Sequence, residues 1–180
     1  MGENHIVSID YVAKPKQTVY FLGWDDGVRN NEQVWTQGQG KYTSHWLPSF
    51  DDMTEKVEFD LDILLKEDYT VIANGNLVKK EALPDSDGYL WQFDMEEPMS
   101  SYLVGFAIGD YNKKTIESSS GVPIELYYEP TDFAKVEPTY RYTAHIFDFL
   151  ETEIGIPYPW QNYKQVPVQD FLYAGMENTT

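Results

Sequence analysis

The segment Glu55-Lys-Val-Glu-Phe-Asp-Leu-Asp-Ile-Leu-Leu65 decides the fold class, because apolar and acidic side chains alternate along it. The apolar members would share one face and the acidic members the other: Val57, Phe59, Leu61 and Ile63 against Glu58, Asp60 and Asp62. A period of two is typical of a β-strand with one buried face and one solvated face. The segment therefore predicts an antiparallel sheet that is wet on one side.

Runs rich in β-branched and aromatic residues extend this pattern on both sides of the segment. His5–Val12 and Gln17–Gly23 predict a hairpin-like pair, and a polar loop is expected at Asp25–Asn31. Tyr69–Ala73 and Asn76–Lys80 predict a hairpin through an Asn-Gly turn. Three further strands are expected, of which the second is apolar on both faces and therefore central: Tyr89–Asp94, Ser101–Asp110 and Gly121–Tyr128. Strands at this spacing predict an antiparallel β-sandwich or saddle.

The pattern changes after Tyr128, where we place a domain boundary between residues 1–128 and 129–180. Pro138 is suited to the first turn of a helix, and Gly155 to its end. The apolar stripe of this helix would consist of Tyr142, Ile146, Phe149 and Leu150. Lys164–Asp170 predicts an edge strand, because Pro167 cannot donate a ladder hydrogen bond.

The composition is that of a folded, acidic protein. Hydrophobic residues make up 42% and aromatic residues 16% of the 180 residues, which favours a substantial core. A formal net charge of -17 argues against nucleic acid and anionic membranes as partners. The chain has no cysteine, so disulfides and thiolate chemistry are excluded. No apolar run approaches the ~20 residues of a membrane-spanning helix.

Two stretches hold candidate binding residues. In Thr36-Gln-Gly-Gln39, the side chains of Gln37 and Gln39 would point to the same face if the segment is extended, where neutral amides could bind a ligand; a Gly-rich turn is the alternative. In Tyr173-Ala-Gly-Met-Glu-Asn178, a lone carboxylate follows a glycine that lets another backbone approach closely. That arrangement suits an extended peptide gripped by its main chain, with Glu177 meeting its cationic amino end. An edge strand with an exposed glutamate is the alternative.

The second stretch resembles the exopeptidase signature of the zinc aminopeptidases of the aminopeptidase N and leukotriene-hydrolase family. Ala174 departs from the usual first glycine, whereas Met176, Glu177 and Asn178 match it. Further segments are similar to the family in the same order: Thr36–Gln39 with Trp46–Lys56, Pro98–Asp110, Ile154–Pro159 and Gln165–Phe171. The resemblance covers residues 36 to 180.

The resemblance implies a β-saddle domain followed by the opening helix and edge strand of a thermolysin-like α/β catalytic domain. It further implies that Glu177 binds the α-amino group of a peptide substrate with a free amino terminus. Gln37 and Gln39 would line the first side-chain pocket, the backbone of Ala174 and Gly175 would pair with the substrate, and Tyr173 and Met176 would form apolar walls. Asn178 completes the motif.

Zinc is expected in the full-length enzyme and not in this segment. The three histidines, His5, His45 and His145, include no pair four residues apart, and a hydrolytic zinc site commonly takes two histidines at that spacing and a carboxylate. We therefore expect a segment that stops before the zinc motif, lacks the first strands of its β-domain and is inactive alone. Its expected partners are the remainder of the catalytic domain and, for the isolated segment, a second copy. The alternative function is a non-catalytic β-sandwich module that binds a ligand or partner.

Overall fold

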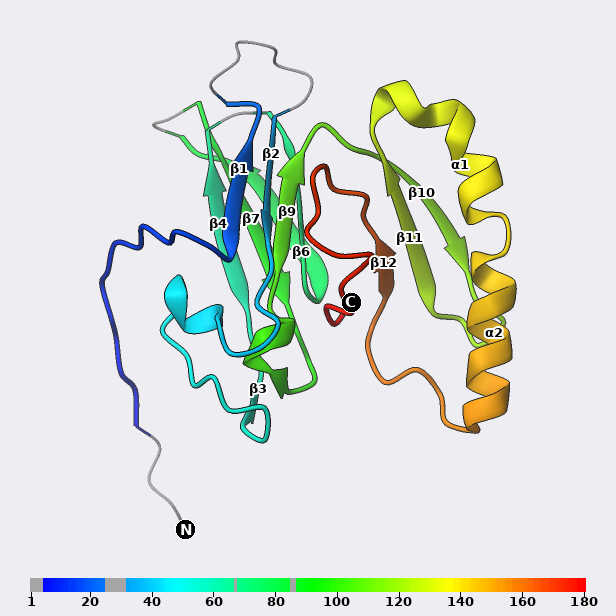
Figure 1. The fold of residues 1–180 in the computed structure, drawn as a ribbon, viewed down its shortest axis with the longest axis horizontal. Helices are drawn as coiled ribbons and strands as arrows, with labels where there is room; N and C mark the ends of the chain where they lie inside the picture. Colours follow the sequence, from blue (N-terminus) through cyan, green and yellow to red (C-terminus); the bar gives the residue numbers. More distant parts are fainter. Residues whose placement is uncertain (1–4, 25–31, 67, 85–86) are drawn as a thin grey trace.

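The computed structural model describes residues 5–24, 32–66, 68–84 and 87–180 of the chain. Two antiparallel sheets, of strand order β1-β2-β9-β5 and β4-β7-β6, face each other as a sandwich (Figure 1). The first contains Val19–Leu22 (β1), Gln33–Thr36 (β2), Phe106–Gly109 (β9) and Thr70–Ala73 (β5). The second contains Leu61–Leu65 (β4), Tyr89–Asp94 (β7) and Asn76–Ala82 (β6). Short segments complete this part of the fold: β3 (Lys56–Val57) pairs with β8 (Met99–Ser100), and η1 (Thr43–His45) and η2 (Ser101–Leu103) are 3-10 turns.

The core of the sandwich comes from the inward faces of both sheets. Val34, Val71 and Ile108 of the first sheet belong to one buried cluster with Trp91 and Phe93 of the second. Leu61, Ile63 and Leu65 of β4 pack against this cluster, whereas the two residues between them on the strand are exposed. The alternation that the sequence shows along this strand is therefore confirmed, as is the mainly antiparallel β class.

A third sheet, β10-β11-β12, lies between the sandwich and the helices (Figure 1). Its strands are β10 (Asn112–Glu117), β11 (Pro123–Tyr128) and β12 (Tyr163–Gln165). β11 and β12 are parallel, so the chain needs a long crossover between them. It runs through η3 (Pro130–Asp132), α1 (Phe133–Tyr140) and α2 (Thr143–Ile154). Phe147 of α2 packs on Ile124 and Leu126 of β11, whereas Tyr127 contacts Ile72 of the sandwich on the opposite face.

Two predicted hairpins are wrong. Residues 5–12 form no strand within the described chain and are exposed, and β1 pairs instead with β2. β5 and β6 flank Asn74 and Gly75 as predicted, but β5 pairs with β9 and β6 with β7. The Asn-Gly dipeptide is thus a corner between the two sheets of the sandwich rather than a hairpin turn. The loop expected at Asp25–Asn31 lies outside the described residues.

Other strand predictions also differ from the structure. The strand predicted at Ser101–Asp110 is central, as expected, but it begins only at Phe106 (β9), because residues 101–103 form the 3-10 turn η2. The alternating segment at residues 55–65 is divided into β3 and β4, because residues 58–60 leave the ladder. β10 is not predicted by the sequence pattern, because it is polar and five of its six residues are exposed. β12 is an edge strand as predicted, but it ends at Gln165, two residues before Pro167.

The helical region matches the prediction at its end but not along its surface. Gly155 caps α2 with a φ of +72°, a left-handed conformation that glycine adopts readily. Pro138 lies inside α1, which begins five residues earlier, instead of in a first turn. The predicted apolar stripe is exposed, because α2 turns Phe147 toward the third sheet: Tyr142, Ile146, Phe149 and Leu150.

Candidate functional site

The candidate motif lies in a loop of residues 171–180 that contains no helix or strand. Figure 1 shows this loop in red between the sandwich and β12. The stretch is therefore not an edge strand. Within the described chain, the backbone groups of residues 172–178 make no hydrogen bond. The shape of the loop must come from the segments at its two ends.

The first end of the loop is fixed to β2. The Gln169 backbone N–H donates to Gln33 Oε1 over 2.8 Å, and the Trp35 indole Nε1–H donates to the Gln169 carbonyl over 3.1 Å. Gln33 and Gln169 both donate to Glu129 Oε1 over 2.8 Å. The Phe171 ring then packs on Trp35, with 5.1 Å between ring centroids.

The second end is fixed to the corner between β5 and β6. The Asn74 side-chain amide donates to the Thr179 carbonyl, and the Gly75 N–H donates to Thr180 Oγ1 over 2.7 Å. Thr179 and Thr180 are buried, in contrast to most of the loop before them. Sequence reasoning missed these anchors, because it took Asn74 and Gly75 as a hairpin turn and gave no role to Trp35.

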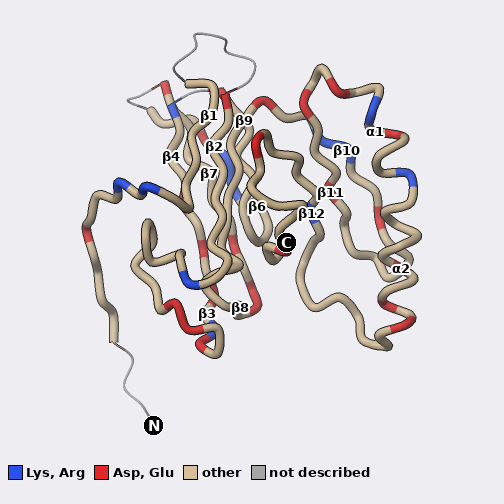
Figure 2. Tube along the Cα trace, in the orientation of Figure 1, with Lys and Arg blue, Asp and Glu red and all other residues tan. Residues whose placement is uncertain are grey.

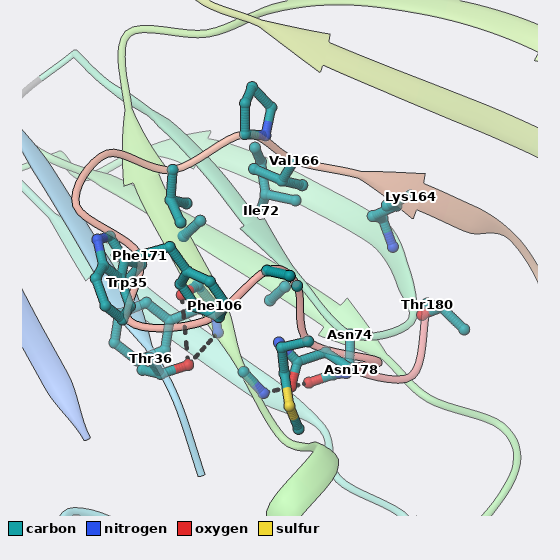
Figure 3. Close-up of a pocket in the computed structure, with 18 residues that line it drawn as sticks. Trp35, Thr36, Ile72, Asn74, Phe106, Lys164, Val166, Phe171, Asn178 and Thr180 are labelled. Carbon is teal, nitrogen blue, oxygen red and sulfur yellow. Dashed lines mark hydrogen bonds between the residues drawn. The ribbon is translucent and has the colours of Figure 1, made fainter. Parts of the chain in front are cut away.

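A pocket of about 310 Å³ opens between the loop and the first sheet. Figure 3 shows side chains from β2, β5, β9, β12 and the loop around it. Its apolar wall includes Trp35, Ile72, Phe106, Val166 and Phe171. Among the predicted binding residues, the pocket is lined by Ala174, Gly175, Met176 and Asn178.

Gly175 is open to its surroundings. A Cβ built on this residue would meet no atom within 4 Å, and its φ is outside the left-handed region. The described chain therefore gives no steric reason for a glycine at this position. Asn178 differs, because its side chain lies against Gly105, where an added Cβ would come within 3.1 Å of the Asn178 amide nitrogen.

The other predicted binding residues lie apart from the pocket lining. Tyr173 and Glu177 are exposed, and Glu177 makes no ion pair or hydrogen bond with another described residue. Gln37 is buried, and its Nε2 has no hydrogen-bond partner among the described atoms. Gln39 is exposed in a turn, with its backbone N–H donating to Gln37 Oε1 over 2.8 Å. The chain is not extended beyond β2, so the two glutamines do not share a face as predicted.

Lys164 is the basic residue in the pocket wall. Its Nζ donates to the Gly75 carbonyl over 2.5 Å and to Asn162 Oδ1 over 2.6 Å. Burial lowers the pKa of this ammonium group to about 8, although nearby Glu125 opposes the shift. Figure 2 shows that acidic residues are spread over the sandwich, its turns and the helices.

Neither a metal centre nor a membrane-spanning helix is present in the described part of the chain. Within residues 5–24, 32–66, 68–84 and 87–180, no three histidine, cysteine, aspartate or glutamate side chains gather as metal ligands could. The described residues of this chain therefore offer no site for the zinc that the resemblance implies for the full-length enzyme. No described helix is long and apolar enough to cross a bilayer.

Comparison with known proteins identifies the family. The family model "Peptidase M1 N-terminal domain" matches residues 2–103. The chain belongs to the M1 peptidase family. It is 30% identical over 174 residues to glutamyl aminopeptidase of Rattus norvegicus, covering 89% of this chain and 18% of that protein. It is 26% identical over 143 residues to puromycin-sensitive aminopeptidase of Caenorhabditis elegans, covering 79% of this chain and 15% of that protein.

The family match and these relatives confirm the family resemblance that the motif and the other matching segments indicated. A third relative, glutamyl aminopeptidase of Bos taurus, is 28% identical over 135 residues, which cover 73% of this chain and 14% of that protein. The chain thus spans less than a fifth of the length of these relatives. These relatives are named as aminopeptidases, which supports a segment of an aminopeptidase family member.

Proposed function

We propose that this chain is the part of an M1 aminopeptidase that recognises the free amino terminus of a peptide substrate. In this proposal the Glu177 carboxylate binds the substrate α-ammonium group, and the backbone at Ala174 and Gly175 pairs with the substrate main chain. An α-amino group has a pKa near ~8, so it is largely cationic at neutral pH. A carboxylate at a fixed position would select peptides by the presence of that charge.

The open space at Gly175 is the observation that carries the proposal. A glycine that its own chain does not require is explained when another backbone approaches it. The adjacent loop backbone is unpaired within the described residues, so its N–H and C=O groups are available to an extended peptide. Glu177 is exposed beside this backbone, while Met176 lines an apolar pocket.

Hydrolysis in this proposal belongs to the longer protein. Zinc polarises a carbonyl group or activates water when it is bound in a peptidase. The residues described in this chain do not form a site for it, so the ligands and the general base would come from elsewhere in the enzyme. The contribution of this chain is to bind and orient the amino end of the substrate.

The proposal is tested by Glu177→Gln in the longer enzyme, which keeps the shape of the side chain and removes its charge. We expect kcat/KM for an aminoacyl anilide with a free amino group to fall roughly 30- to 1000-fold, or ~2–4 kcal/mol, because a charged partner loses its counter-charge. An acetylated anilide should be a poor substrate for the parent enzyme, and its kcat/KM should fall little further in the Glu177→Gln variant. Glu153→Gln on the exposed surface of α2 is the matched control and should be silent. Equal small losses on both substrates would show that Glu177 does not read the amino terminus.

A further inference from the structure

We propose that the Asn74–Gly75 corner of the sandwich is a positioning element that holds the loop of residues 171–180 in shape by binding its last two residues. This inference rests on the proposed function, because it assigns the corner a role in presenting that loop to a substrate. The corner joins β5 of the first sheet to β6 of the second. It therefore lies between two strands that are paired in their sheets, whereas the loop has no secondary structure of its own.

The orientation of the Asn74 side chain is determined by its partners. Its Oδ1 accepts from the Gly105 N–H over 2.7 Å, and a backbone N–H can only donate. Its Nδ2 donates to the Leu103 carbonyl over 3.1 Å and to the Thr179 carbonyl, and carbonyls can only accept. All three contacts require the same amide orientation. Since both Nδ2 hydrogens are used, the amide has no donor left for a ligand and acts through the loop.

Gly75 adds contacts on both sides of the loop. Its N–H donates to Thr180 Oγ1, just after the motif. Its carbonyl accepts from Asn162 Nδ2 over 3.2 Å and from Lys164 Nζ over 2.5 Å, before the loop begins. One dipeptide thereby fixes the distance between the strand that enters the loop and the residues that leave it.

The geometry of the corner cannot shift easily. Asn74 is 1% exposed, and Gly75 has a φ of +77° with the Asp94 carbonyl oxygen 2.1 Å from where a Cβ would be. Buried amides keep their hydrogen bonds because an unmade bond there is costly. Between this corner and the Trp35 contact at the other end, residues 172–178 form a bridge without internal hydrogen bonds in the described chain. Changing the corner should therefore loosen the bridge and leave the sheets in place.

Limited digestion with chymotrypsin tests the positioning role directly. Leu172 and Tyr173 are exposed cleavage sites in the loop, and Tyr11 in the exposed segment at residues 5–12 is an internal standard. Asn74→Ala should raise cleavage after Tyr173, relative to cleavage after Tyr11, about tenfold or more. Thr70→Val is the matched control, because it removes a hydrogen bond to the Tyr111 carbonyl from the other end of β5. It should leave the ratio unchanged.

Two further variants protect the test against simple unfolding. Asn74→Asp keeps the acceptor for the Gly105 N–H but places a carboxylate oxygen against the Thr179 carbonyl. It should therefore raise cleavage after Tyr173 as much as Asn74→Ala does. Thr180→Val removes the acceptor of the Gly75 N–H from the loop side and leaves every sandwich residue intact. It should raise cleavage after Tyr173 in the same direction. Cleavage ratios equal to that of Thr70→Val in all three variants would overturn the inference.

In the longer enzyme, comparing the change in KM with the change in kcat separates a positioning role from a general loss of stability. Asn74→Ala should raise KM for a free-amino aminoacyl anilide about tenfold and change kcat less than about twofold, because the loop is displaced rather than chemically altered. A fall in kcat with an unchanged KM would contradict the positioning role. The cleavage ratio does not depend on Glu177, whereas the Glu177→Gln measurement does not depend on Asn74. Failure of the proposed function is therefore distinguishable from failure of this inference.

Discussion

Gly75→Ala should destabilise the chain far more than a glycine substitution at the same backbone angle elsewhere. An alanine in the left-handed region costs ~1–2 kcal/mol. At Gly75 the new Cβ would also lie 2.1 Å from the Asp94 oxygen and 2.6 Å from its carbonyl carbon. Asp94 pairs with Asn76 in the β6–β7 ladder, so its carbonyl cannot swing aside. Forced overpacking costs a further ~1–3 kcal/mol, for a total of roughly 2–5 kcal/mol.

Gly155→Ala provides the matched control for that experiment. Gly155 has a φ of +72°, close to the +77° of Gly75, but a Cβ added there would meet no atom within 4 Å. It should lose only the conformational ~1–2 kcal/mol. Urea unfolding followed by tryptophan fluorescence measures both variants against the parent. Equal losses within about 0.5 kcal/mol would refute the assignment of a steric clash at the corner.

The site, the pocket wall and α2 lead to three further predictions. The purified chain should not hydrolyse an aminoacyl anilide, and chelator-sensitive turnover by this chain would contradict the proposed division of labour. The free energy of unfolding should rise by about 1 kcal/mol between pH 8 and 9, because the Lys164 pKa is lowered to about 8 when folded, so the unfolded chain binds more protons in this window. Lys164→Met should flatten that rise, and an unchanged slope would assign it to other groups. The isolated chain should self-associate through the exposed α2 stripe, so Ile146→Glu with Phe149→Glu should lower the sedimentation coefficient toward that of a monomer.

Local periodicity predicted several strands, including β4 and β7, but not which strands they pair with. The alternation around Leu61 and Ile63 survives in β4, because one face of that strand packs on the sandwich core. The same kind of local signal at residues 5–12 predicted a strand that has no partner in the described chain. Asn74-Gly75 has the composition of a hairpin turn, but which sheet each flanking strand joins depends on contacts with β9 and β7. Those contacts are distant in sequence and leave no local pattern.

The motif residues could be named from the sequence, but the way they are held could not. Met176 and Asn178 line the pocket. Their role in binding a substrate stays a prediction. Gln37 and Gln39 could share a face only if the segment were extended. The strand ends at Thr36 and the chain then turns, so the two side chains lie apart. Trp35 and Asn74 gave no motif signal, since an indole or amide that binds a distant carbonyl looks the same in sequence as any other. Only the fold brings them to the two ends of the loop.

The contacts of the corner have a consequence for the order of folding. Asn74 and Gly75 each bond to a residue 105 positions later in the chain. The last strand of the sandwich, β9, ends at Gly109, 62 residues before the loop begins. At ~5–20 residues per second, a ribosome would release it roughly 3–12 s before the loop. By comparison, a local hairpin forms in ~1–10 μs, and small domains dominated by non-local strand pairing fold in milliseconds to seconds. The sandwich can therefore be folded before residues 171–180 emerge, and the loop takes its shape last, by binding to a surface that has already formed.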